Sequence, residues 1–149
     1  MRAVIQRVKN ASVSVAQNII SEINSGLLVF LGVEQSDTEA DCSYMAEKIA
    51  NLRIFEDADG KMNLSVMDIR GSILIVSQFT LLGDVRRGRR PSFTSAMEPD
   101  QARILYERCA GKITEYGILV RKGSFREMMQ IELCNDGPVT ILIDSKKIF

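Results

Sequence analysis

The sequence contains no histidine, and this absence removes the most common general base and the most common metal ligand of enzymes. Any acid–base chemistry therefore needs another proton acceptor. The three cysteines, Cys42, Cys109 and Cys134, are scattered, and without histidine partners they do not have the spacing of a zinc site. We expect neither a metal nor any other cofactor.

Long hydrophobic runs and an excess of charge of one sign are also missing. The longest apolar stretches, residues 27–33 and 72–82, are shorter than the ~20 residues that span a bilayer, so we expect no membrane segment. The 19 basic and 19 acidic residues cancel, and any contact with RNA must come from a local patch. An odd number of unpaired cysteines and the lack of a signal-peptide pattern predict a cytoplasmic protein.

The apolar residues that are present are sufficient for one core. A length of 149 residues with 46% apolar content predicts a single domain, residues 1–149. Alternating and continuous apolar segments predict strands at residues 3–8, 12–16, 19–23, 27–33, 52–55, 62–66, 72–82, 118–120, 129–134 and 139–144. The first three of these should form an antiparallel meander, and residues 27–33 should lie in the centre of the sheet.

Two helices are expected between these strands. The first should extend over about residues 37–50 after a capping box formed by Ser36 and Glu39. The second should begin at Pro99 and stop near Gly117. The order of elements predicts an α+β domain with a mixed, mainly antiparallel β-sheet, partly barrel-like, packed with two main helices.

Residues 77–81 place polar side chains at the end of an apolar run. Because side chains alternate across a strand, a regular strand cannot direct Ser77, Gln78 and Thr80 into one pocket. We expect the strand to end near Gln78, so that backbone amides and the Thr80 hydroxyl can meet a ligand. The alternative is structural: Thr80 favours a strand, and Ser77 and Gln78 cap its end.

A second polar string, residues 135–140, lies between two apolar runs. Its Asn-Asp-Gly-Pro sequence is ordinary turn chemistry, and a turn between two strands is the simplest interpretation. The functional alternative is that a cis bond between Gly137 and Pro138 points two neighbouring carbonyls the same way and forms a rigid wall of acceptors. The sequence leaves both interpretations open.

The apolar residues of 83–94 are spaced neither as in a helix nor as in a strand, which predicts an exposed loop. The loop carries Arg86, Arg87, Arg89 and Arg90 around a glycine. Forked guanidinium groups can bind phosphates, and these arginines are therefore candidate nucleic-acid contacts. They could equally form a solvated, charged loop without a partner.

Taken together, these segments resemble the D-aminoacyl-tRNA deacylases, also called D-tyrosyl-tRNA deacylases. The resemblance covers nearly the whole chain, and it is carried by residues 5–8 (Ile-Gln-Arg-Val), 26–29, 53–55, 60–64, 77–81, 90–93 and 135–140. Each motif alone is weak, whereas the set in this order is specific.

The resemblance implies a homodimeric cytoplasmic enzyme that hydrolyses the ester of D-aminoacyl-tRNA to free D-amino acid and tRNA, as chiral proofreading. Its partner would be the aminoacylated 3′ end of tRNA, with neither DNA nor a membrane involved. Gly137 and Pro138, joined in cis and inserted into the pocket of the other subunit, would read chirality. The positions that match the family's catalytic residues are Ser77, Gln78, Phe79 and Thr80, and those that line or support the pocket are Arg7, Phe125 and Met129. The four arginines of the loop become candidate tRNA contacts.

The missing histidine bears on the mechanism that this resemblance implies. No obvious base is present to activate the Thr80 hydroxyl, so we favour assistance by the 2′-hydroxyl of the terminal ribose. Main-chain amides near Phe79 and Thr80 would stabilise the oxyanion. A backbone wall would clash with the β-carbon of an L-residue, and because glycine lacks this carbon we expect some activity on glycyl-tRNA.

Two other functions remain open, and the sequence departs from the family's usual pattern. A non-catalytic RNA-binding module could stack bases on Phe79 or Phe93. A general esterase is disfavoured because there is no Ser-His pair. Residues 125–128 and 82–83 depart from the small residues common in the family, which we expect to affect substrate range only.

Overall fold

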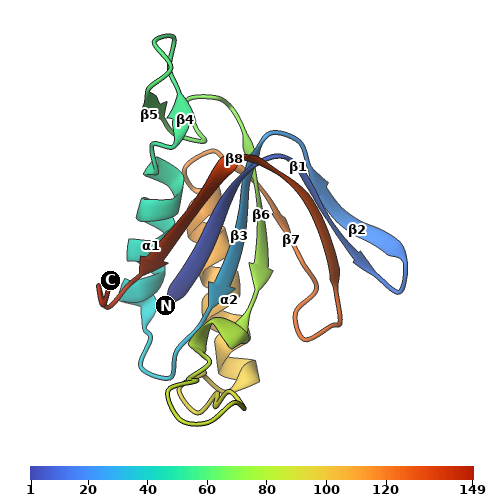
Figure 1. Ribbon diagram of the computed structural model, residues 1–149, viewed down its shortest axis with the longest axis vertical. Coiled ribbons are helices and arrows are strands. Elements are labelled where there is room, and N and C mark those ends of the chain that lie inside the picture. Colours follow the sequence, from blue (N-terminus) through green and yellow to red (C-terminus); the bar gives the residue numbers. More distant parts are fainter.

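A curved mixed sheet with two helices against one face makes up the structure (Figure 1), a computed structural model that describes residues 1–149. The elements in chain order are β1 (Arg2–Val15), β2 (Asn18–Ile23), β3 (Gly26–Gly32), α1 (Glu39–Asn51), β4 (Phe55–Glu56), β5 (Met62–Leu64), β6 (Ser72–Ser77), the 3₁₀ helix η1 (Phe79–Leu82), α2 (Pro99–Thr114), β7 (Leu119–Lys122) and β8 (Gln130–Asp144). Neither α-helix is long and apolar enough to cross a membrane.

The strand order is β2-β1-β3-β6-β7, with β8 paired to β1, and β4 and β5 form a separate small hairpin. Strand β1 pairs antiparallel with β2, β3 and β8, whereas β3 with β6 and β6 with β7 are parallel. The prediction of a mixed, mainly antiparallel sheet with two helices is therefore confirmed. The central position predicted for residues 27–33 is also confirmed, because β3 lies between β1 and β6.

Both faces of the central strands are buried, which explains their continuous apolar sequences. On β3, Leu27, Val29 and Leu31 pack in a core cluster that also contains buried side chains of α1 and α2. Leu28 points into a second cluster with Val13 of β1, inside the curl of the sheet. The two clusters hold the end of β6 between them, at the place where the candidate site begins.

Strands β1 and β8 are longer than the sequence predicted. The expected breaks within residues 3–16 and at residues 135–138 are wrong, because β1 is continuous over 14 residues and β8 over 15. The partner strand explains the difference: both halves of β8 pair with β1, from Asp144 opposite Arg2 to Gln130 opposite Ser14. The polar string is therefore a bulge within one strand and not a hairpin turn.

The boundaries of other elements also differ from those expected. The helix α1 begins at Glu39, and its capping box consists of Thr38 and Asp41 instead of Ser36 and Glu39. The helix α2 begins at Pro99 as predicted and ends at Thr114, before the turn at Gly117. Strand β6 ends at Ser77 and not at residue 82, β4 covers 55–56 and not 52–55, β5 covers 62–64 and not 62–66, and β7 covers 119–122 and not 118–120.

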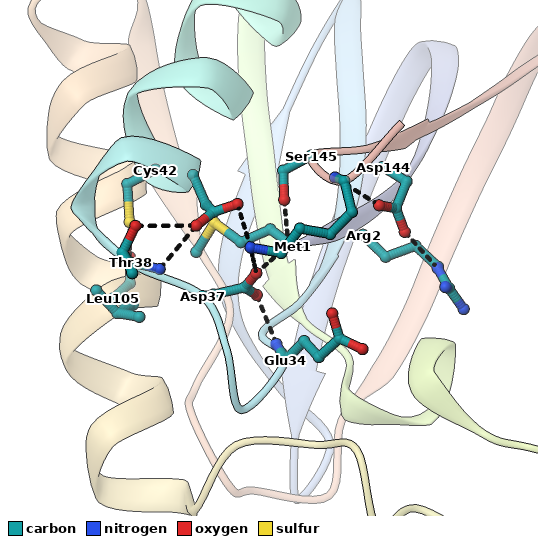
Figure 2. Close-up of polar contacts among 11 residues, drawn as sticks. Met1, Arg2, Glu34, Asp37, Thr38, Cys42, Leu105, Asp144 and Ser145 are labelled. Atoms are coloured by element: carbon teal, nitrogen blue, oxygen red, sulfur yellow. Dashed lines mark hydrogen bonds and ion pairs between the residues drawn. The ribbon is translucent and has the colours of Figure 1, made fainter. Parts of the chain in front are cut away.

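A buried network ties the two ends of the chain to the start of α1 (Figure 2). The ammonium group of Met1 donates to Asp37 and to the Ser145 hydroxyl, each over 2.5 Å. The other carboxylate oxygen of Asp37 accepts from the Glu34 amide, and the helix begins only after the extended backbone of Thr38. Arg2 pairs with Asp144 over 3.1 Å and also donates to the Leu81 carbonyl, so the network braces η1.

Candidate active site

Strand β6 ends at Ser77, and the chain then turns into η1. Gln78 leaves the strand geometry, with φ −145° and ψ 83°, while its amide still donates to the Leu31 carbonyl over 2.8 Å. Its side-chain amide nitrogen donates to the Thr80 hydroxyl. The expected end of the strand near Gln78 is confirmed. The turn gathers polar groups that a regular strand would have directed to opposite faces.

A cavity of about 630 Å³ opens beside this turn and is lined mostly by apolar side chains. The ends of β3 and β6 and the residues just after them supply Leu31, Val33, Ser77 and Gln78, and η1 supplies Phe79. The helix α2 supplies Pro99, Ala102 and Tyr106. The remaining lining residues come from two loops and the start of β8: Phe93, Ala96, Met97, Glu98, Phe125, Arg126, Glu127, Met128, Met129 and Ile131. A cavity of this size and character suits a small organic ligand. It contains Ser77, Gln78, Phe79, Phe125 and Met129 of the predicted site.

Aromatic side chains shape the cavity wall. Phe79, 57% exposed, meets Phe93 edge to face, with ring centroids 5.0 Å apart. Tyr106 is buried, and its ring packs against that of Phe125, with ring centroids 5.7 Å apart. Its hydroxyl donates to the Ile75 carbonyl over 2.9 Å, and burial raises the pKa of Tyr106, so this donor stays protonated. A tyrosine of α2 is thus hydrogen-bonded to the backbone of β6 near the end of that strand.

The bulge of β8 is held rigidly by side chains. Arg7, almost completely buried, donates to the Asp136 carbonyl over 2.7 Å and to the Ile54 carbonyl over 2.6 Å. The Asn135 side chain spans the bulge, because it donates to the Val139 carbonyl over 3.0 Å and accepts from the Val139 amide over 2.9 Å. Gly137 at its tip is exposed, and its bond to the next residue is cis.

This bulge and the cavity lie far apart within one chain. Arg7, beside the bulge, pairs with Leu27 of β3, whereas Ser77 pairs with Leu31 of the same strand. Four residues along β3 correspond to about 13 Å, and the three strand spacings from β8 to β6 correspond to about 14 Å. Neither Gly137 nor Pro138 lines the cavity of its own chain.

The arginine-rich loop adjoins the cavity through Phe93. A bridge between Asp84 and Ser92, with N–H···O distances of 2.8 and 2.9 Å, closes the base of the loop. Arg86 folds back and binds the Asp84 carboxylate with two hydrogen bonds, of 2.9 and 2.6 Å. Those bonds lower the pKa of Asp84 to about 2. The expected exposed loop is confirmed.

Comparison with known proteins identifies the family. The family model described as D-Tyr-tRNA(Tyr) deacylase matches residues 4–144. The chain belongs to this deacylase family. The D-aminoacyl-tRNA deacylases of Thermotoga petrophila and Fervidobacterium nodosum are 58% and 56% identical to it over 149 residues, which is the whole of each chain. A solved structure titled c-Myc DNA Unwinding Element Binding Protein is 42% identical, with a TM-score of 0.91 over 97% of this chain and 98% of that chain.

The family predicted by the sequence is therefore confirmed, and the deacylase fold brings only part of the predicted site together. Thr80 is exposed at the edge of η1, hydrogen-bonded to Gln78, and does not line the cavity. The bulge and its support Arg7 are remote from it. Sequence reasoning did not assign Tyr106 to the site, although a tyrosine on an apolar helix stripe needs a partner for its hydroxyl and so gives a signal.

Proposed function

We propose that this protein hydrolyses the ester that joins a D-amino acid to the 3′ end of tRNA and releases free D-amino acid and tRNA. The observation that carries the proposal is the apolar cavity at the end of β6, in a chain that belongs to the deacylase family over residues 4–144. The whole chain, 1–149, acts as one domain in the cytoplasm. The reaction as proposed uses no metal or other cofactor.

The turn from Ser77 to Thr80 is the proposed catalytic centre. Because the Thr80 oxygen accepts a hydrogen bond from Gln78, its hydroxyl proton is free to form a hydrogen bond to the substrate without leaving Thr80. No histidine is available to remove that proton, so Thr80 acts as a donor and not as the nucleophile. Water attacks the ester carbonyl and gives up a proton, the bond to the ribose 3′-oxygen breaks, and the proton lost by the water is passed on to the 3′-oxygen. The 2′-hydroxyl of the same ribose assists this transfer.

Main-chain amides complete the proposed centre. The amides of Phe79 and Thr80 begin η1 and have no acceptor within that helix. They would donate to the oxyanion that forms on the ester carbonyl. Ser77 and Phe79 line the space for the ester and the terminal adenosine, with Phe125 and Met129 on the opposite wall.

We further propose that two chains form a homodimer in which the bulge of one subunit enters the cavity of the other. The bulge is exposed and held by side-chain hydrogen bonds, and neither Gly137 nor Pro138 lines the cavity of its own chain. Apolar side chains on β8, Leu133 and Leu142, are exposed and available for contact between subunits. Main-chain atoms of Gly137 and Pro138 would then clash with the β-carbon of an L-residue. Glycine has no such carbon, so glycyl-tRNA is also a substrate.

The deciding experiment compares D-tyrosyl-tRNA and L-tyrosyl-tRNA in EDTA, with terminal adenosine or 2′-deoxyadenosine at the 3′ end. We expect rapid release of D-tyrosine alone, and a large loss of rate without the 2′-hydroxyl. Intact D-tyrosyl-tRNA after long incubation would contradict the deacylase function. If the protein nevertheless bound tRNA, equally with and without the amino acid, the non-catalytic RNA-binding alternative would replace it.

A further inference from the structure

The arginine loop carries three positive charges that the fold does not use. Arg86 is paired with Asp84, but Arg87, Arg89 and Arg90 have no carboxylate within 4.0 Å and are exposed. Gly88, at φ +74°, lets the chain turn sharply between them. Because the whole chain has no net charge, these side chains form a local basic patch and not part of a general field.

The position of the loop relates this patch to the cavity. Phe93 ends the loop and lines the cavity, and its ring is fixed against Phe79. Gly83, where the loop begins, lies close to the Phe93 ring: a β-carbon added to Gly83 would be 3.0 Å from the nearest ring carbon. Arg90 is three residues from Phe93, which limits the separation of their backbones to about 10 Å.

The part of the cavity wall beside α2 carries more negative than positive side chains. Glu98, Arg126 and Glu127 line the cavity near the start of α2, and Asp100 lies 3.8 Å from Arg126, so three carboxylates face one guanidinium group there. These carboxylates repel a polyanion. A nucleic acid whose 3′ end occupies the cavity therefore leaves it over the arginine loop and not over α2.

We propose that Arg87, Arg89 and Arg90 form a phosphate-binding site for the tRNA backbone next to the aminoacylated 3′ end, while Arg86 braces the loop. This inference rests on the proposed deacylase function and adds a positioning role for the loop. The contacts are sequence-independent, because they are made to phosphates, and each is lost with increasing salt. The loop lowers KM and does not take part in bond cleavage.

The test replaces all three residues together, Arg87→Gln, Arg89→Gln and Arg90→Gln. For D-tyrosyl-tRNA at low salt we expect KM to rise tenfold or more with kcat unchanged. The slope of log Kd for uncharged tRNA against log salt should decrease by roughly 2 to 3, at about 0.7 to 0.9 per phosphate contact. Cleavage of D-tyrosyl-adenosine, which has no internucleotide phosphates, should stay within twofold of that by the unmodified protein.

Two control proteins separate a phosphate site from general charge. Arg70→Gln removes an exposed arginine with no ion pair, in the turn before β6 at the end of the molecule opposite the loop (Figure 1), and should leave KM and the salt slope unchanged. The triple lysine replacement keeps the charges and should retain most of the salt slope. An unchanged slope in the glutamine protein, or an equal loss on D-tyrosyl-adenosine, would overturn the proposal.

The failure of the loop proposal and the failure of the deacylase function give different results. If the unmodified protein cleaves neither substrate, the deacylase function fails. The salt titration of uncharged tRNA needs no catalysis and still decides whether the three arginines bind phosphates. If both substrates are cleaved equally well by the unmodified and glutamine proteins, only the loop proposal fails.

Discussion

At the scale of single residues, the hydrogen bond from Gln78 to Thr80 underlies the role proposed for the Thr80 hydroxyl. Because the Thr80 oxygen accepts a hydrogen bond from Gln78, the hydroxyl proton is left to donate to a bound substrate in the proposed mechanism. If the Thr80 hydroxyl joins the main-chain amides as a donor to the oxyanion, Thr80→Ala should lower kcat by about 10² to 10³, the usual loss for one such donor. Thr80→Ser should retain most activity. Single-turnover deacylation measures both, and an alanine protein as active as the original would contradict the role.

Gly137 is the residue on which the proposed chiral selection depends most. A β-carbon built there would lie 2.2 Å from the Val139 amide nitrogen, so Gly137→Ala must move the backbone of the bulge. We expect the ratio of D- to L-tyrosyl-tRNA cleavage to fall at least tenfold, with far-ultraviolet circular dichroism unchanged because the residue is exposed. As a control, Lys9→Ala alters only an exposed neighbour of the bulge, 3.9 Å from Asp136. An undiminished ratio in Gly137→Ala would separate the bulge from chirality.

At the scale of elements, the Tyr106 hydroxyl links α2 to the Ile75 carbonyl near the end of strand β6. The Ile75 carbonyl also accepts from the Gly123 amide over 3.0 Å, so Tyr106→Phe leaves this carbonyl with one partner. We expect a loss of about 1 kcal/mol in the free energy of unfolding, the usual contribution of one hydrogen bond, and little change in kcat. Urea denaturation measures the first quantity. A loss of activity without a loss of stability would instead place Tyr106 in the chemistry.

The helices and strands also show which parts of the fold and of the candidate site could be predicted from the sequence. Apolar periodicity predicted both helices and the buried strands β3 and β6, since burial on both faces leaves a local signature. It did not predict the continuity of β8, because the pairing of Asn135 opposite Val8 is a long-range fact that no local pattern contains. The cavity was predicted only in part: Phe125 and Met129 came from family resemblance, whereas Tyr106 depends on how α2 packs on the sheet.

At the scale of the whole molecule, buried thiols couple stability to alkaline pH. Burial raises the pKa of Cys42 to about 11 and that of Cys109 to about 12, from an ordinary value near 9. Unfolding releases these thiols to ionise, so their contribution to stability is complete below about pH 9 and is lost as pH rises from 9 toward 12. Urea titrations at pH 8, 9 and 10 should show this loss, and Cys42→Ala should make it smaller. A stability independent of pH over this range would contradict it.

The third cysteine, Cys134, differs from these two and offers a practical way to follow assembly. Cys42 and Cys109 are shielded, whereas Cys134 is exposed on β8, next to the bulge proposed to cross between subunits. A thiol reagent should therefore modify a single position in the folded chain. If β8 is covered when two chains associate, the rate of that reaction should increase as the protein is diluted, and a constant rate would argue against an interface there. The unaltered protein thus carries its own reporter of monomer and dimer, and no cysteine has to be added by mutation.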